Sequence, residues 1–209
     1  MSMNTTTFTV VRHGQTTHNR IRRFQGQFNS QLDDVGLAQA AAVARRLSAC
    51  AYDAVYASDL DRTVDTVRAI VGDRPVTFLP ALREWHLGEW QDQQIDDIRR
   101  RHPDQYAIYA GGSADFAFPG GESHDQLLAR VAACFEELAQ RHRGQAVLVV
   151  AHGGTLRSLL FHAIGVRRLP CSPISHNTSV SRFLHHEGRG WQLELWNDTS
   201  HLEAAPGLG

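Results

Sequence analysis

Two histidine–glycine pairs each follow a short run of apolar, largely β-branched residues. His13-Gly14 comes after the run at 8–11, and His152-Gly153 comes after the run at 146–151. Such runs predict buried strands, and ligands bind to open α/β sheets at the carboxyl ends of strands. We therefore expect the two imidazoles to meet at one site, with His13 as a nucleophile for phosphoryl groups.

Two arginines and a glutamate at further predicted strand ends could complete this site. Arg12 directly precedes His13, Arg62 follows a second predicted strand, and Glu84 follows a third. Phosphoryl transfer depends on positioning and on stabilising charge at the phosphate oxygens, which a planar guanidinium does well. A neutral imidazole can attack phosphorus, and a carboxyl group can protonate the leaving alkoxide and then activate water. The set predicts phosphoryl transfer through a phosphohistidine.

Each of these residues also has a purely structural explanation. A lone histidine after a strand is usually a hydrogen-bonded structural residue, Arg62 could face solvent on its helix, and Glu84 could pair with Arg83. The prediction of function depends on the combination, because both histidines stand in His-Gly pairs after strands.

The composition argues against several other kinds of protein. Of the 209 residues, 42% are apolar and 21% are charged, and all 21 basic residues are arginine. The lack of lysine excludes a Walker A loop, a Schiff base and pyridoxal phosphate chemistry. The net charge of −1 argues against nucleic-acid binding, and no apolar run approaches the roughly 20 residues of a membrane span. The polar segment 1–7 has no signal-peptide pattern, so we expect a cytoplasmic protein.

Neither a disulfide framework nor a metal site is expected. Cys50, Cys134 and Cys171 form no Cys-x-x-Cys pair, and buried thiols are the simplest interpretation. No His-Glu-x-x-His helix motif is found among the histidines. We therefore expect no metal and no cofactor.

The order of predicted elements indicates how the site is held. Strands are predicted at 8–11, 54–57, 76–79 and 145–151, with a hairpin of 179–184 and 191–196, and helices at about 34–48, 63–71, 92–101, 123–138 and 155–164. This alternation predicts an α/β fold, a mainly parallel doubly wound sheet with helices on both faces. We expect one domain, 1–209, with residues 85–125 as a helical and loop insertion over the site. Within it, residues 102–121 form either a lid or a packed surface excursion.

Four motifs contain the residues singled out above. They are Arg12-His13-Gly14 with Asn19, Ser58-Asp59-Leu60-x-Arg62-Thr63-x-x-Thr66, Leu82-Arg83-Glu84-x-x-Leu87-Gly88-x-Trp90 and His152-Gly153-Gly154. In this order they resemble the histidine phosphatase superfamily, also called phosphoglycerate-mutase-like, over residues 8 to about 202. The resemblance implies that His13 is the phosphorylated nucleophile, Glu84 the acid and base, and Arg12, Arg62 and His152 the phosphate pocket. The further substrate-binding residues that it implies are Asn19, Arg23, Gln25, Gly26 and Gly153.

The segment Arg23-Phe24-Gln25-Gly26 is similar to the phosphatase branch of this superfamily. Cofactor-dependent mutases typically have serine in place of Gln25, and a lysine-bearing segment after the catalytic glutamate that is missing here. The resemblance thus implies a metal-independent phosphatase for small phosphorylated metabolites. A phosphoglycerate mutase and a non-catalytic binding module on the same fold are the alternatives. Gln91-Asp92 departs from the Glu-Gly that relatives often have, which affects only the expected pocket rim.

One motif is typical of a different class of phosphatase. Asp59-Leu60-Asp61-Arg62-Thr63 fits the Asp-x-Asp-x-Thr pattern of haloacid-dehalogenase-type phosphatases, but those enzymes also need a lysine. The aromatic residues Trp85, Trp90, Tyr106, Tyr109, Phe116 and Phe118 predict a wall for a substrate with an uncharged, partly apolar remainder. The expected partner is therefore a small phosphorylated substrate, and a homodimer is compatible with the sequence.

Overall fold

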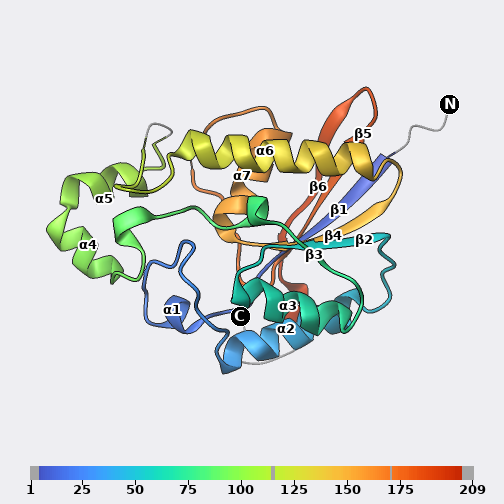
Figure 1. The fold of residues 1–209 in the computed structure, drawn as a ribbon, viewed down its shortest axis with the longest axis horizontal. Coiled ribbons are helices and arrows are strands. Elements are labelled where there is room, and N and C mark those ends of the chain that lie inside the picture. The colour runs from blue at the N-terminus through green and yellow to red at the C-terminus, as the bar shows by residue number, and fades with distance from the viewer. Residues whose placement is uncertain (1–4, 114–115, 170, 204–209) are drawn as a thin grey trace.

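A six-stranded sheet forms the centre of the computed structural model, which describes residues 5–113, 116–169 and 171–203 (Figure 1). Its strands are β1 (Thr5–Arg12), β2 (Ala54–Ala57), β3 (Thr77–Phe78), β4 (Ala146–Ala151), β5 (Val180–His186) and β6 (Gly190–Asp198). They lie in the order β3-β2-β4-β1-β5-β6. The first four in this order are parallel, whereas the hairpin of β5 and β6 adds to β1 in antiparallel fashion. The predicted mainly parallel α/β sheet is confirmed.

Helices cover both faces of this sheet. They are α1 (Thr17–Arg20), α2 (Asp34–Leu47), α3 (Asp61–Val71), α4 (Ile95–Arg101), α5 (Pro103–Ala110), α6 (His124–Arg141), α7 (Gly153–Ala163) and α8 (Ser200–Glu203), with single 3-10 turns at Pro80–Leu82 and Gly88–Trp90. Figure 1 shows α6 and α7 on one side of the sheet and α2 and α3 on the other.

Strand β4 shows why the sheet needs cover on both faces. Val147 and Val149 pack into the apolar cluster beneath α6 and α7, whereas Leu148 and Val150 pack into the cluster beneath α2 and α3. Successive side chains of a strand point to opposite faces, so a strand that is apolar at every position is stable only with both faces covered. Because β1 lies beside β4 in parallel, with Arg12 opposite Ala151, the residues that follow these strands emerge at the same edge.

The segment between β3 and α6 differs from its predicted form. Residues 103–110 were expected to be irregular, but they form α5, which starts with Pro103 at a position where proline suits a helix. Phe116 and Phe118 are buried against Trp85 and Trp90. Of the two alternatives for residues 102–121, the described part of the segment agrees with the packed one. Helices α4 and α5 extend beyond the sheet at the left of Figure 1.

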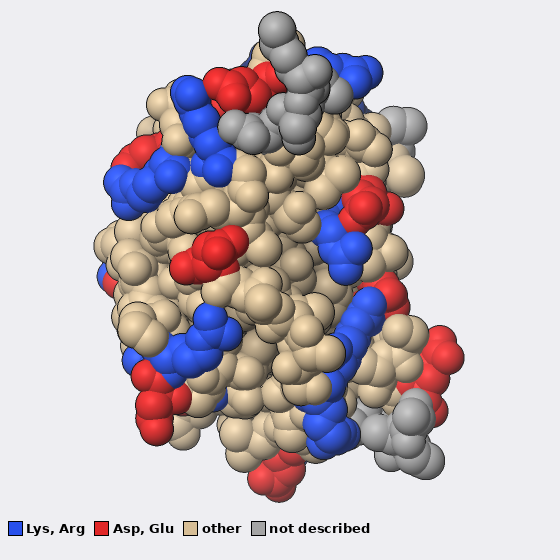
Figure 2. Space-filling view, turned by 90° about the vertical axis from the view of Figure 1, so that its right-hand side faces the viewer, with Lys and Arg blue, Asp and Glu red and all other residues tan. Residues whose placement is uncertain are grey.

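The surface mixes charges of both signs. On the face in Figure 2, arginine side chains lie among acidic ones rather than in one basic band. None of the helices in the described ranges is long and apolar enough to cross a membrane. The three cysteines are free thiols, and only Cys134 is buried. The expectation of buried thiols was therefore wrong for Cys50 and Cys171.

Candidate active site

His13 lies directly after β1, and its imidazole is held in one orientation by hydrogen bonding. Its backbone N–H donates to the carbonyl oxygen of Ala151 (3.0 Å), and its Nδ1 lies 2.7 Å from the carbonyl oxygen of Gly14. A carbonyl only accepts hydrogen bonds, so Nδ1 carries the proton and Nε2 keeps its lone pair. Within the described part of the chain, no hydrogen bond occupies Nε2.

The backbone around His13 is fixed from three sides. The side-chain amide of Asn177 donates to the His13 carbonyl oxygen (2.9 Å), and the Gly14 N–H donates to Oγ1 of Thr66 (3.1 Å). A Cβ on Gly14 would lie 2.6 Å from the carbonyl oxygen of Gly36. The glycine after the histidine is therefore required by a close approach of two backbones, which restricts how the imidazole can turn.

Burial and neighbouring guanidinium groups keep the His13 imidazole uncharged. Burial, and then the charges of Arg62 and Arg12, hold the pKa of His13 well below its ordinary value of 6.5. The hydrogen bond to Gly14 opposes this shift only in part. At neutral pH the ring is in the form that can attack phosphorus.

His152 lies against His13 but deeper in the protein. The two ring centroids are 5.2 Å apart, and His152 is fully buried. Burial and the charge of Arg62 lower the pKa of His152 well below 6.5, so this ring is also neutral. Among the described residues, neither of its ring nitrogens has a hydrogen-bond partner. Buried polar atoms without partners are rare, so the ring is suited to a hydrogen bond with a ligand bound beside it.

Arg12 and Arg62 border a cavity of about 180 Å³, the phosphate cavity, into which His13 also faces. Backbone carbonyl groups orient both guanidinium groups: Arg12 donates to Ser175 (2.5 Å) and Arg62 to Gly26 (2.6 Å). The Nε of each arginine is buried and has no partner in the described ranges. Burial lowers the pKa of Arg62 to about 10, which leaves it charged at neutral pH. The two cations are thus arranged for the oxygens of an anion.

Glu84 contributes a carboxylate to the same cavity. Its Oε1 accepts a hydrogen bond from the backbone N–H of Trp85 (2.8 Å), and its Oε2 accepts one from the N–H of Gly154 (3.0 Å). Gly154 belongs to the first turn of α7, which begins directly after His152. The acid predicted from one motif and the glycines of another are therefore in contact.

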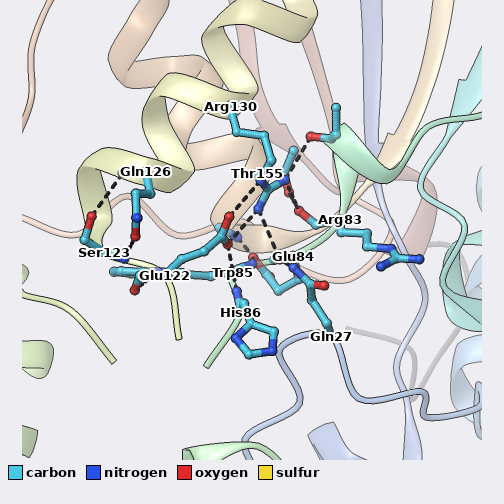
Figure 3. A network of polar contacts seen from close by, with 12 residues as sticks. Gln27, Arg83, Glu84, Trp85, His86, Glu122, Ser123, Gln126, Arg130 and Thr155 are labelled. Atoms are coloured by element: carbon cyan, nitrogen blue, oxygen red, sulfur yellow. Dashed lines mark hydrogen bonds and ion pairs between the residues drawn. The ribbon is translucent and has the colours of Figure 1, made fainter. Parts of the chain in front are cut away.

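A partly buried ion pair between Arg130 and Glu122 fixes the loop that carries Glu84 (Figure 3). Arg130 of α6 donates to the carbonyl oxygens of Ala81 (2.9 Å), Arg83 (3.0 Å) and Glu84 (3.4 Å). Its remaining donors hold the carboxylate of Glu122, with both contacts at 2.8 Å. The sequence analysis missed Arg130 and Glu122, because no local pattern links them to Glu84.

The contact between Gly154 and Glu84 allows a first prediction. A Cβ at Gly154 would lie 2.2 Å from Oε1 of Glu84, so Gly154→Ala must displace the carboxylate. We expect kcat/KM for an alkyl phosphate to fall about 10-fold or more, because a misplaced acid protonates the leaving group poorly. Gly153→Ala is the matched comparison, since its Cβ would meet nothing closer than 3.4 Å, and its loss is expected to be far smaller. Equal losses in the two variants would contradict the assigned contact.

Four of the five further contacts implied by the sequence line the phosphate cavity. These are Asn19, Arg23, Gln25 and Gly26. The side-chain oxygens of Asn19 and Gln25 accept hydrogen bonds from the N–H (3.1 Å) and the hydroxyl (2.9 Å) of Thr16, which leaves their NH₂ groups as donors. Gly153 was expected among these contacts but does not line the cavity; it forms the first residue of α7.

The prediction that aromatic side chains form a wall of the substrate site is confirmed only in part. Trp85 and Tyr109 line the phosphate cavity, whereas Trp90 and Phe118 are buried in the core and do not line it. Arg157 of α7, which the sequence analysis missed, also lines the cavity. Arg157 lies four residues after Gly153, about one helical turn along the same face of α7. This spacing could have identified Arg157 from the sequence.

The competing aspartate motif has a structural role instead. Both carboxylate oxygens of Asp59 accept hydrogen bonds from Arg83 (2.7 and 2.6 Å), and Asp59 does not line the phosphate cavity. The Thr63 hydroxyl donates to the carbonyl oxygens of Ser58 and Leu60. In the part of the chain that the structure describes, no group of three His, Cys, Asp or Glu side chains could hold a metal ion.

Comparisons with known proteins agree with this geometry. The family model described as histidine phosphatase superfamily (branch 1) matches residues 8–199. A metal-independent phosphoserine phosphatase of Arabidopsis thaliana is 36% identical over 204 residues, which cover 95% of this chain and 84% of that protein. Phosphoglycerate mutase-like protein 4 of the same plant is 37% identical over 199 residues, covering 93% and 86%. The solved structure of mycobacterial glucosyl-3-phosphoglycerate phosphatase is 30% identical, with a TM-score of 0.85, and covers 93% of this chain and 100% of that chain.

Proposed function

Because the chain belongs to the histidine phosphatase superfamily, we propose that it hydrolyses phosphomonoesters of small metabolites through a phosphohistidine on His13. The observation that carries this proposal is the state of His13. Its Nδ1 proton is engaged by the Gly14 carbonyl, so Nε2 is free to attack in a cavity shared with Arg12 and Arg62. The likeness to a metal-independent phosphoserine phosphatase and to glucosyl-3-phosphoglycerate phosphatase supports a hydrolase.

The first half-reaction transfers the phosphoryl group to the enzyme. The phosphate oxygens are bound by Arg12 and Arg62. His152, which was also expected in this pocket, is fully buried and does not line the cavity. The lone pair of His13 Nε2 forms the N–P bond as the ester P–O bond breaks. The proton of the Glu84 carboxyl group passes to the leaving oxygen, so the alcohol departs neutral.

The second half-reaction returns the enzyme to its starting state. The Glu84 carboxylate takes a proton from a water molecule, whose oxygen forms a bond to phosphorus as the N–P bond breaks. Inorganic phosphate leaves, and His13 is again a neutral imidazole with its proton on Nδ1. The positive charge at the phosphate comes from guanidinium groups throughout, so no step requires a metal ion.

A direct assay separates this phosphatase from the mutase alternative. A mutase must keep its phosphoenzyme away from water until the intermediate returns, whereas a phosphatase must admit water beside it. With 3-phosphoglycerate and catalytic 2,3-bisphosphoglycerate in EDTA, we expect release of inorganic phosphate and little 2-phosphoglycerate. The reason is that Gln25 lines the cavity where mutases typically have serine.

Three outcomes of this assay are informative. Rapid isomerisation with negligible phosphate would overturn the phosphatase assignment and leave the same residues as a mutase site. O-phosphoserine and p-nitrophenyl phosphate, tested in parallel, should release phosphate at measurable rates. A purified, folded chain that turns over none of these esters would support the third alternative, a binding module.

A further inference from the structure

Arg23 differs from the other arginines of the phosphate cavity in the group that holds it. The arginines that line this cavity are Arg12, Arg23, Arg62 and Arg157. The other three donate to neutral acceptors, two of them to backbone carbonyl groups and one to a serine hydroxyl. Arg23 instead donates to the carboxylate of Asp92 (2.5 Å) and to the carbonyl oxygen of the same residue (2.9 Å). Within the described ranges, Arg23 is the one cavity arginine that forms an ion pair.

The Asp92 carboxylate is ionised at neutral pH. Its Oδ1 also lies 2.9 Å from Nε2 of His18. The hydrogen bonds from Arg23 and then from His18 hold the pKa of Asp92 below its ordinary value of 3.8. A negative charge therefore stands directly beside the guanidinium of Arg23. It offsets part of the positive charge that this arginine brings to the phosphate cavity.

The backbone at Asp92 does not explain why its side chain is charged. Asp92 has a φ of 57°, in the left-handed region that disfavours most side chains. Asparagine tolerates this region as aspartate does, and glycine adopts it freely. Either residue would suit the turn, whereas only the carboxylate can form the ion pair with Arg23.

The rim of the cavity around Arg23 is held without the carboxylate. The backbone N–H of Asp92 donates to the carbonyl oxygen of Phe24 (2.8 Å), and the N–H of Phe24 donates to that of Gln93 (2.9 Å). The contact from Arg23 to the Asp92 carbonyl oxygen is independent of the side chain as well. The Nε of Arg23 is buried and has no partner among the described residues, so a donor remains for a bound anion. Removal of the charge at Asp92 should therefore leave the guanidinium in place.

We propose that Asp92 is a positioning residue that partly neutralises Arg23, so that the phosphate cavity releases inorganic phosphate, the product, more readily. This inference rests on the proposed phosphatase function. Arg12 and Arg62 already bring two cations to the cavity. A third full charge would strengthen the binding of substrate and product alike, which lowers KM without raising kcat. Tighter binding of the product would slow its departure, a step that limits many enzymes.

Asp92→Asn isolates the charge, because asparagine keeps a side-chain oxygen that can accept from Arg23. We measure the Kd of inorganic phosphate by calorimetry, and its inhibition constant against p-nitrophenyl phosphate. At low ionic strength we expect both constants to fall about 3-fold to 10-fold, the scale of one partly screened charge near a dianion. The KM for p-nitrophenyl phosphate should fall in parallel, with no rise in kcat. Salt should reduce the difference from the wild type.

Two further variants complete the test. Asp97→Asn is the control, because Asp97 pairs with Arg100 on α4 and neither residue lines the phosphate cavity. It removes the same charge and should leave phosphate binding unchanged. Asp92→Gly removes the carboxylate in a residue that suits the backbone, and should shift the constants in the same direction as Asp92→Asn. Either Asp92 variant tests the idea if the other does not fold.

Three results would overturn the proposal. Unchanged or weaker phosphate binding in Asp92→Asn would show that the carboxylate does not moderate the charge of Arg23. An equal shift in Asp97→Asn would show that the effect is not local. Opposite shifts in Asp92→Asn and Asp92→Gly would assign Asp92 to the orientation of Arg23 and not to its charge.

Failure of this inference is distinguishable from failure of the proposed function, because calorimetry requires no turnover. If the wild type hydrolyses p-nitrophenyl phosphate but Asp92→Asn binds phosphate like the wild type, the phosphatase stands and the role of Asp92 is wrong. If the wild type binds phosphate but hydrolyses no phosphomonoester, the proposed function is wrong, and the change in Kd still decides whether Asp92 moderates Arg23. A wild type that neither binds phosphate nor hydrolyses an ester would overturn both.

Discussion

Replacement of His13 by alanine is expected to abolish the phosphoenzyme and to lower turnover by about 10⁴-fold or more, the scale seen when a nucleophile is removed. The reason is geometric. His13 lines the phosphate cavity together with Arg12 and Arg62, whereas His152 is fully buried and does not line it. The neighbouring histidine therefore cannot take over the attack.

Rapid quench with labelled substrate is the measurement for this variant. The wild-type enzyme should yield a label that is lost in acid and retained in base, as expected of a phosphohistidine. His102→Ala, at an exposed histidine between α4 and α5, should label and turn over like the wild type. A label that survives acid and maps to Asp59 or to a serine would contradict the assignment of His13.

Replacement of Glu84 by glutamine is expected to slow an alkyl phosphate far more than p-nitrophenyl phosphate. An alkoxide is a poor leaving group and needs a proton in the transition state, whereas nitrophenolate does not. We expect a loss of about 10²-fold or more for the alkyl ester, the usual range of acid–base catalysis. Glutamine has nearly the same shape, although its single side-chain oxygen can accept only one of the two N–H groups that hold Glu84. The loop should remain in place because Arg130 holds its backbone carbonyl groups.

The control for this variant is Glu89→Gln, at an exposed glutamate of the same segment that does not line the phosphate cavity. It should leave both esters unaffected. Equal losses on the two esters in Glu84→Gln would assign Glu84 mainly to activation of water in the second half-reaction. An alkyl ester hydrolysed at the wild-type rate would remove Glu84 from the mechanism.

Much of the fold could be predicted because its signals are local. The apolar runs before His13 and His152 predict strands that are buried on both faces, and such strands form the centre of a parallel sheet. The helix predicted at about 123–138 is confirmed as α6, which begins after Ser123 with a capping box that includes Gln126. The third strand was predicted at 76–79 but pairs only at Thr77–Phe78. Helix α5 was missed, because the glycine and aromatic residues that follow Pro103 indicate a loop.

The candidate site was likewise predicted only in part. The sequence alone predicted the residue types of the candidate site, because His13, Arg12, Arg62 and Glu84 stand in short motifs at strand ends and helix starts. It did not determine what holds them. Arg12 is oriented by the carbonyl group of a residue 163 positions away, and Arg130 holds the Glu84 carbonyl from 46 positions away. Contacts of this kind leave no periodic pattern along the chain.

A second cavity of about 420 Å³, which Trp85, Tyr109 and Arg157 line, is likewise a product of the tertiary structure. Its walls come from the insertion, from α7 and from the segment around Arg168, and the cavity exists only where these pack together. From the sequence, the aromatic residues of the insertion predicted an apolar wall, and Arg157 was one helical arginine among many. In the structure Arg157 lines the same two cavities as Tyr109. The residue types of the candidate site were thus readable from local sequence, whereas the cavities beside them depend on which distant segments the fold brings together.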